Sequence, residues 1–352
     1  MAAMGFVKSG AQQRAAGAGD GGLREEMIDG QRLVRLVRIP KAELHLHLEG
    51  SIEPGTLREI DPSLSLAEIE EYTKYEDFAG FLRAYVWVNK RLQTPEHYAL
   101  ALRRLALTLA AQGVVYAEIT LSAGVILWKG QDLDAIYGAL WEESQRAPIA
   151  IRWIFDAVRQ FGAEAARPVV EFAAGARERG VVAFGIGGDE VRGPAREFAE
   201  VFREAREAGL RLTCHAGETA GPESVREALA IGAERIGHGI AAIEDEALMT
   251  ELRERAIPLE ICVTSNVRTG VVASSEAHPL RRLYEAGVPV LINTDDPALF
   301  GCTLAGEYEL ARRLGFSEAE LEELAKASLR FAFAEPDAYG ASGSEQAGSS
   351  GP

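Results

Sequence analysis

A repeated alternation of short β-branched runs with longer helical patterns constrains the fold of this chain more than any other feature. Eight runs have the length and composition of strands. They cover residues 41–50, 114–122, 151–159, 181–190, 210–218, 235–240, 258–266 and 289–297. Apolar residues recur at helical spacing over residues 95–113, 132–146, 165–179, 194–208, 222–231, 244–254 and 317–332. This rhythm predicts a closed parallel (β/α)8 TIM barrel, with an open doubly wound α/β sheet as the alternative.

The remaining segments indicate how the chain is divided. Residues 1–30 are rich in Gly, Ala, Gln and Ser without a sustained apolar period, and residues 336–352 are similarly biased. Both are expected to be disordered tails, because such segments bury too little apolar surface to fold. Residues 31–335 are expected to form a single barrel domain, since this fold commonly needs that length.

The connection after the first strand is much longer than an ordinary βα loop, since it runs over residues 48–94. Within it, aromatic and apolar residues recur at spacings of three and four, which predicts a helix with one apolar face. The face consists of Phe78, Phe81, Leu82 and Tyr85. It either packs into the core or forms an inserted helical lid over an active site.

The charge and cysteine content restrict the class of partner and the compartment. The chain has 53 acidic and 37 basic residues, a net charge of −16, which repels nucleic acid and anionic membranes and favours a small neutral or cationic substrate. Its three cysteines form no Cys-x-x-Cys pair, which favours a reducing compartment. No apolar run is long enough to span a membrane and no signal-peptide pattern is present, so a cytoplasmic location is expected. The oligomeric state is left open.

Histidines gather at the ends of the predicted strands, where the chemistry of a barrel takes place. Four of the six lie there: His45, His47, His215 and His238. His45 and His47 alternate by two on one strand, so both side chains point to the same side. The other two, His97 and His278, fall in segments expected to be helical. Four imidazoles at one end of one sheet predict a metal site far more strongly than His-x-His alone.

Carboxyl groups accompany these histidines. Glu218 follows His215 by three residues, with Gly217 permitting a tight turn, and is a candidate proton donor. Asp295 and Asp296 follow an apolar strand, where two acids are costly unless a cation or hydrogen-bond donors meet them. Imidazoles with a carboxylate suit zinc. The alternatives are core histidines, a helix-capping Glu and Asp residues in a surface loop.

Five motifs within residues 38–333 together resemble one known family. They are Pro-Lys-Ala-Glu-Leu-His-Leu-His-Leu-Glu-Gly-Ser at 40–51, His-Ala-Gly-Glu-Thr at 215–219, Arg-Ile-Gly-His-Gly at 235–239, Leu-Glu-Ile-Cys-Val-Thr-Ser-Asn at 259–266 and Asn-Thr-Asp-Asp-Pro at 293–297. In this order and at these separations, the chain resembles the adenosine and adenine deaminases of the amidohydrolase superfamily. The resemblance implies zinc-dependent hydrolytic removal of the 6-amino group from an adenosine-like purine.

The resemblance also implies a role for each matching residue. One zinc ion per chain would be bound by His45, His47, His215 and Asp295. Glu218 would protonate purine N1, His238 would act as a base or an electrostatic stabiliser of the attacking oxygen, and Asp295 would orient that oxygen. The implied substrate contacts are Gly188 at N3, Asp296 at N7, Glu49, and the apolar residues Phe78, Phe81 and Leu82. Glu260 and Ser265 would support the metal ligands.

Three departures from the family pattern concern the substrate. Glu49 stands where adenosine deaminases usually have an Asp that touches the ribose 5′-hydroxyl, Gly185 replaces a frequent Asp, and Val263 replaces a frequent Pro. The sugar side of the substrate therefore stays open. The alternatives to adenosine are 6-amino-6-deoxyfutalosine, a menaquinone precursor, and then free adenine. A non-deaminating amidohydrolase and a non-catalytic binding protein are the alternatives from other classes.

Overall fold

The computed structural model describes residues 37–334, so the two expected tails lie outside the described residues. Eight parallel strands form one sheet in the order of the sequence. They are β1 (Lys41–His47), β2 (Val114–Leu121), β3 (Ala150–Val158), β4 (Val181–Gly187), β5 (Arg211–Ala216), β6 (Arg235–His238), β7 (Leu259–Ile261) and β8 (Val290–Ile292). All eight predicted strands are confirmed.

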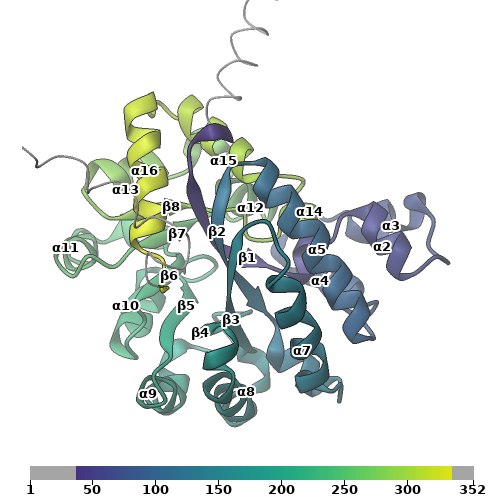
Figure 1. Ribbon diagram of the computed structural model, residues 1–352. Coiled ribbons are helices and arrows are strands. Elements are labelled where there is room, and N and C mark those ends of the chain that lie inside the picture. The colour runs from purple at the N-terminus through teal and green to yellow at the C-terminus, as the bar shows by residue number, and fades with distance from the viewer. Residues whose placement is uncertain (1–36, 335–352) are drawn as a thin grey trace, which may run out of the picture.

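The last strand returns to the first and closes the sheet. Leu46 and Asp295 form a parallel bridge. The backbone N–H of His47 donates to the Asp295 carbonyl, and the N–H of Asp295 donates to the His45 carbonyl, both at 2.9 Å. The fold is therefore the expected (β/α)8 barrel, surrounded by helices (Figure 1), and not an open sheet.

Seven long helices match the predicted ones: α5 (Pro95–Ala111), α7 (Leu133–Ser144), α8 (Ala163–Gly175), α9 (Ala199–Glu207), α10 (Pro222–Ala230), α11 (Glu246–Glu254) and α16 (Glu318–Arg330). Outside the long first connection, five further helices were not predicted: α6 (Ala123–Trp128), α12 (Val263–Arg268), α13 (Leu280–Glu285), α14 (Pro297–Phe300) and α15 (Leu304–Arg313). Most of these are too short to display a helical period. Within residues 37–334, no helix has both the length and the apolar character needed to cross a membrane.

Single 3-10 turns join several elements: η1 (Glu49–Ser51), η2 (Arg159–Phe161), η3 (Arg177–Arg179), η4 (Ala195–Phe198), η5 (Ile240–Glu244) and η6 (Ser275–Ala277). One sequence-based placement is wrong, because His278 lies between η6 and α13 and not in a helix. Its side chain is buried, and its ring is held by Asn266 on α12 and by the backbone N–H of Leu280.

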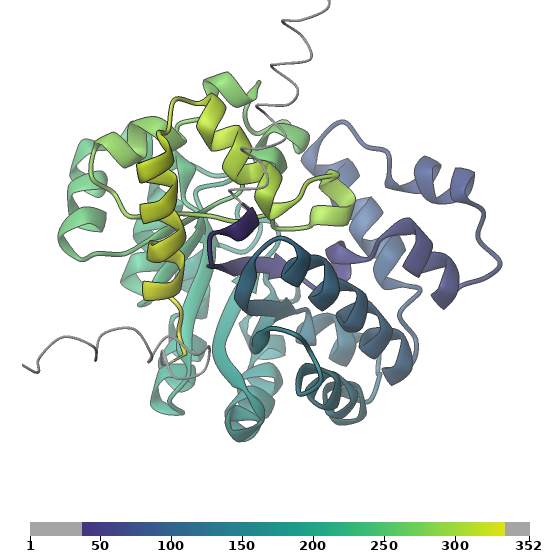
Figure 2. The same ribbon diagram turned by 45° about the horizontal axis from the view of Figure 1, so that its top comes forward.

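The long first connection folds into three helices, α2 (Pro54–Ile60), α3 (Leu66–Thr73) and α4 (Phe78–Asn89). Figures 1 and 2 show α2 and α3, in purple and blue, standing to one side of the barrel. The carboxylate of Asp77 caps α4 by accepting from the N–H of Gly80 at 2.7 Å. The predicted helix in this connection is therefore confirmed.

A bulge in β1 aims the first two histidines. The register of β1 against β2 shifts between Glu43 and Leu46, where β1 contains one extra residue. Bulges re-aim the side chains that follow them. His45 lies within this bulge and His47 directly after it, and both face the barrel interior, where their rings approach the ring of His215.

Candidate active site

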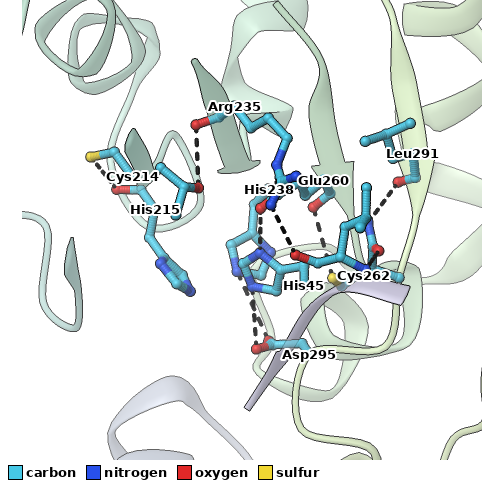
Figure 3. Close-up of polar contacts among 12 residues, drawn as sticks. His45, Cys214, His215, Arg235, His238, Glu260, Cys262, Leu291 and Asp295 are labelled. Carbon is cyan, nitrogen blue, oxygen red and sulfur yellow. Dashed lines mark hydrogen bonds and ion pairs between the residues drawn. The ribbon is translucent and has the colours of Figure 1, made fainter. Parts of the chain in front are cut away.

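Four imidazoles and one carboxylate converge at the carboxyl ends of the strands. The ring centroid of His45 lies 4.6 Å from that of His215, 5.0 Å from that of His238 and 5.5 Å from that of His47. Nε2 of His47 lies 3.2 Å from Nε2 of His215 and 3.4 Å from Oδ1 of Asp295. Figure 3 shows the Asp295 carboxylate facing His45 and His238. The barrel thus gathers every residue that the sequence placed around a metal.

Two of these histidines are held with a lone pair toward the cluster. Nδ1 of His45 lies 2.8 Å from Glu260, and Nδ1 of His215 lies 3.1 Å from the Ile186 carbonyl. Because acceptors occupy both Nδ1 positions, each neutral ring has its free lone pair on Nε2. Nε2 of His45 is buried without a hydrogen-bond partner, 3.5 Å from Oδ1 of Asp295. A buried nitrogen of this kind facing a carboxylate fits a metal ion.

The charge states agree with a cation site. Burial lowers the pKa of His47 to about 4 and that of His215 well below its ordinary value, so both rings are neutral at neutral pH. Burial also acts on His45, but its contacts with the carboxylates of Asp295 and Glu260 outweigh it and raise the pKa of His45 to about 10. The carboxylates therefore draw a positive charge to His45, and a proton or a metal ion can supply it.

Asp295 carries the negative charge of the cluster. Burial alone would raise the pKa of its carboxyl group, but the contact with His45 and the other neighbouring histidines hold this pKa well below the ordinary value. Its Oδ2 accepts a 2.7 Å hydrogen bond from the hydroxyl of Ser265, as the sequence led us to expect of a ligand support. The backbone of Asp295 has φ of 67°, a strained conformation that barrel closure maintains.

His238 is oriented by a chain of hydrogen bonds that the sequence did not reveal. The backbone N–H of Leu280 donates to Nδ1 of His278 at 3.1 Å, so neutral His278 carries its proton on Nε2. That N–H donates to Oδ1 of Asn266 at 3.1 Å. Nδ2 of Asn266 in turn donates to Nδ1 of His238 at 3.1 Å. Neutral His238 therefore carries its proton on Nε2.

This tautomer distinguishes His238 from the other three histidines. Its Nε2 faces Oε2 of Glu218 at 3.7 Å and Oδ2 of Asp295 at 3.9 Å. Burial lowers the pKa of His238 to about 4, so the ring is neutral at neutral pH. The ligand atoms of His238 lie close enough to the cluster to hold a metal. The proton on Nε2 nevertheless makes it a hydrogen-bond donor, which favours His47 as the third imidazole ligand.

Glu218 lies beside this cluster on a loop held by a second carboxylate, Glu190. Glu190 accepts from the backbone N–H groups of Gly217, Glu218 and Thr219 and from the Ser224 hydroxyl, at 2.7, 2.9, 2.8 and 2.5 Å. Burial raises the pKa of Glu218 well above its ordinary value, and the charges of Asp295 and Glu190 add to this. Glu218 is therefore protonated and can donate a proton. The sequence did not reveal the part played by Glu190.

A cavity of about 420 Å³ opens above the cluster, a size typical of small-molecule sites. The residues that the sequence placed at the substrate line it: Phe78, Phe81, Leu82, Gly188 and Asp296. Burial, and then the charge of Asp295, raise the pKa of Asp296 well above its ordinary value, so this carboxyl group is a donor. A Cβ on Gly50 would fall 1.6 Å from Oδ1 of Asp296, so only glycine fits there.

Glu49 is the one expected substrate contact that the structure sets apart. It is 1% exposed and is not among the described residues that line the cavity. Its carboxylate accepts from the backbone N–H of Ser122 at 3.0 Å and from the hydroxyl of Tyr85 at 3.3 Å. Glu49 therefore lies behind the cavity wall and supports it through Ser122 and Tyr85.

A buried ionic network supports His45 from below. Glu260, which contacts His45, accepts from Nε of Arg235 at 2.6 Å, and Nη2 of Arg235 reaches Glu118 at 2.5 Å. The sequence placed Glu260 beside a ligand but gave no role to Arg235 or Glu118. The sequence could have indicated both residues, because each is a charged residue within a predicted strand. Charges in such positions need a buried partner.

The chain is similar to known deaminases over most of its length. The family model described as adenosine deaminase matches residues 40–341. Aminodeoxyfutalosine deaminase of Streptomyces avermitilis is 40% identical over 310 residues, which cover 84% of this chain and 87% of that protein. Adenine deaminase of Sinorhizobium fredii is 38% identical over 307 residues, which cover 84% of this chain and 94% of that protein.

One of the solved structures that the chain resembles contains a metal ion. An amidohydrolase of Burkholderia ambifaria, solved with bound zinc, matches with a TM-score of 0.79 at 25% identity and covers 87% of this chain and 88% of that chain. These matches confirm the family resemblance and agree with a His and Asp metal site at the barrel mouth. The chain belongs to the adenosine deaminase family and is an enzyme, a hydrolase that acts on C–N bonds.

Proposed function

We propose that this enzyme uses zinc to hydrolyse the 6-amino group of an adenosine-like purine nucleoside, releasing ammonia. One observation carries the proposal: the protonated carboxyl group of Glu218 faces His238 next to the metal cluster, at the base of a cavity of small-molecule size. A proton donor beside a metal site is what deamination of an aromatic ring requires, because the ring nitrogen must be protonated as oxygen attacks.

We assign one zinc ion to His45, His47, His215 and Asp295. When bound, zinc lowers the pKa of a coordinated water from 15.7 to about 7, which makes a nucleophile available at neutral pH. Glu260 and Ser265 keep His45 and Asp295 in place through hydrogen bonds of 2.8 and 2.7 Å. Such partners fix the orientation and basicity of metal ligands.

The remaining side chains position the purine and move protons. Glu218 donates its proton to N1, which makes C6 electrophilic. The N–H at Nε2 of His238 donates to the attacking oxygen, so this residue is an electrostatic stabiliser in our assignment and not the base. The protonated Asp296 donates to N7, and the backbone N–H of Gly188 donates to N3. The proton that remains on the added oxygen then moves to the 6-amino group, the C6–N bond breaks and releases ammonia, and C6 becomes a carbonyl carbon.

Helix α4 supplies the cover of the site in this proposal. Its residues Phe78, Phe81 and Leu82 line the cavity, and the ring of Phe81 stacks on Phe300 with centroids 4.9 Å apart. An apolar cover excludes water, which strengthens the electrostatic interactions between the enzyme and the reacting ring.

Aminodeoxyfutalosine and adenine are the alternative substrates, because relatives of this chain are deaminases named for these two compounds. The chain is 40% identical to an aminodeoxyfutalosine deaminase and 38% identical to an adenine deaminase. Both reactions remove the 6-amino group of an adenine ring, so the same residues serve either substrate.

The experiment supplies purified enzyme with adenosine, methylthioadenosine, aminodeoxyfutalosine and adenine, and follows both ammonia and the adenine absorbance. We expect at least one nucleoside to release one ammonia for each adenine ring converted. Hydrolysis without ammonia would favour another amidohydrolase reaction. No turnover of any of the four compounds would reject the proposal.

A further inference from the structure

Asp156 is a buried carboxyl group at the cavity for which the mechanism above has no use. It lies near the end of β3, is 6% exposed and lines the cavity. Among residues 37–334, no hydrogen bond or ion pair involves its carboxyl group, and the positive charge of Arg159 acts on it only from beyond ion-pair distance. Buried polar groups nearly always have partners, so one facing a cavity without a partner indicates that a ligand supplies it.

Two glycines leave the space that this carboxyl group occupies. Asp156 is paired with Gly185 on the neighbouring strand β4. A Cβ on Gly187 would fall 2.9 Å from Oδ2 of Asp156, and one on Gly185 would fall 3.4 Å from Oδ1. The carboxyl group of Asp156 therefore lies over the backbone of β4, and a side chain at Gly187 would displace it.

The order of the strands indicates which part of the substrate meets Asp156. In the proposed pose, N7 contacts Asp296 after β8, N3 contacts Gly188 after β4, and N1 contacts Glu218 after β5. Going around the barrel from β8 to β4, the strands between them are β1, β2 and β3. Going around the purine from N7 to N3 on the side away from N1, the path runs through C8, N9 and C4, of which N9 carries the substituent. The wall from β1 to β3 therefore faces N9.

That wall offers one carboxyl group with free acceptor atoms. Glu49 lies behind the wall, where Ser122 and Tyr85 occupy its carboxylate. The hydroxyls of Tyr85 and Ser122 are also 2.8 Å from one another. Asp156 is thus the group on this side, within the described residues, that is both at the cavity surface and without a partner.

We propose that Asp156 binds a hydroxyl group of the substituent at N9, so that the substrate is a nucleoside and not the free base. This inference rests on the proposed function, because it uses the purine pose. A free base would leave Asp156 buried and without a partner. Sites built to bond a substrate hydroxyl discriminate strongly against compounds that lack it.

The test measures inhibition by product-like compounds, which does not depend on which nucleoside turns over fastest. Inosine, its 2′-, 3′- and 5′-deoxy forms and hypoxanthine are used as inhibitors of the parent enzyme, Asp156→Ala and Asp156→Asn. In the parent, hypoxanthine and at least one deoxyinosine should bind about tenfold to a hundredfold more weakly than inosine. In Asp156→Ala, that deoxyinosine and inosine should bind equally well.

The control is Asp134→Ala, which removes an exposed carboxyl group paired with Arg179 on the outer surface and should retain the parent selectivity. Hypoxanthine binding the parent as tightly as inosine would overturn the inference. Equal weakening of all five inhibitors in Asp156→Ala would overturn it too, because that result indicates a structural role. If Asp156→Ala does not fold, the near-isosteric Asp156→Asn must show the altered selectivity. If the parent enzyme deaminates no purine at all, that result rejects the proposed function and not the role of Asp156 in particular.

Discussion

At the scale of single residues, proton positions decide how the candidate site works. His45 and His215 present Nε2 lone pairs because Glu260 and a backbone carbonyl occupy their Nδ1 atoms. His238 presents an N–H because Asn266 donates to its Nδ1. Residues of one chemical type therefore have two different roles, and their hydrogen-bond partners set which role each one has.

The chain from His278 through Asn266 is tested by Asn266→Asp. A carboxylate cannot donate to Nδ1 of His238, so the neutral ring would move its proton to Nδ1 and lose the donor at Nε2. We expect kcat to fall by about 10²-fold to 10⁴-fold, the range seen when a catalytic histidine is held in the wrong tautomer. Zinc content and KM should change little. The control is His97→Gln on α5, which lies outside this series of hydrogen bonds and should keep the parent kcat. An unchanged kcat in Asn266→Asp would contradict the assigned tautomer of His238.

The role of Glu218 as the acid is tested by Glu218→Gln. Glutamine keeps the shape but has no proton to transfer, so kcat should fall by about 10²-fold to 10⁴-fold with zinc content unchanged. Full activity in this variant would remove Glu218 from the mechanism.

The pH profile provides a second check on Glu218. Because burial raises its pKa well above the ordinary value, the protonated acid persists through neutral pH and is lost as pH rises through that raised pKa. The parent kcat/KM should therefore fall on the alkaline side. On the acid side, His47 has a pKa lowered to about 4, so its protonation and the loss of metal should occur only as pH falls toward about 4. An activity that keeps rising with pH would contradict an acid role for Glu218.

At the scale of elements, the sequence predicted the helices and strands in which an apolar pattern repeats over many residues. It missed the features that depend on tertiary contacts. The eight strands and seven long helices were predictable because apolar residues repeat along them. The bulge in β1 is set by pairing with β2, and α12 and α14 have only one or two turns. His278 and Glu190 were missed for the same reason, since their partners Asn266 and Ser224 are brought to them by the fold.

The proposed role of α4 as a cover over the site is tested by Phe81→Ala. Loss of this ring opens the cavity to water and removes apolar contact with the substrate, so KM should rise about tenfold or more. Phe81 is 7% exposed and stacks on Phe300, so the free energy of unfolding should also fall by about 3 kcal/mol. Leu107→Ala, at an exposed position of α5, should change neither quantity. A Phe81→Ala enzyme that is less stable but has the parent KM would contradict the lid assignment.

At the scale of the whole molecule, the barrel interior connects stability to the metal site. Arg235 joins Glu118 and Glu260 within the barrel, and Glu260 holds His45, a proposed metal ligand. Removing the positive charge would leave two buried carboxylates without the cation that neutralises them. The same network that completes the interior thus also positions a ligand.

Arg235→Met tests this connection. We expect the free energy of unfolding to fall by about 3–5 kcal/mol and zinc affinity to fall about tenfold or more, measured by denaturant unfolding and chelator competition. Arg211→Met removes a partly exposed pair with Glu234 and should cost less than about 1 kcal/mol, with no effect on zinc. If Arg235→Met is less stable but binds zinc as tightly as the parent enzyme, the network does not support the metal site and the prediction is contradicted.

The central claim, metal-dependent deamination at C6, is tested most directly by removing and restoring the metal while counting ammonia. The purified enzyme should contain about one zinc per chain and release one ammonia for each adenine ring converted. Chelation should abolish ammonia release, and adding zinc should restore it. Full activity in the metal-free enzyme, or ring conversion without ammonia in the zinc-loaded enzyme, would contradict the account.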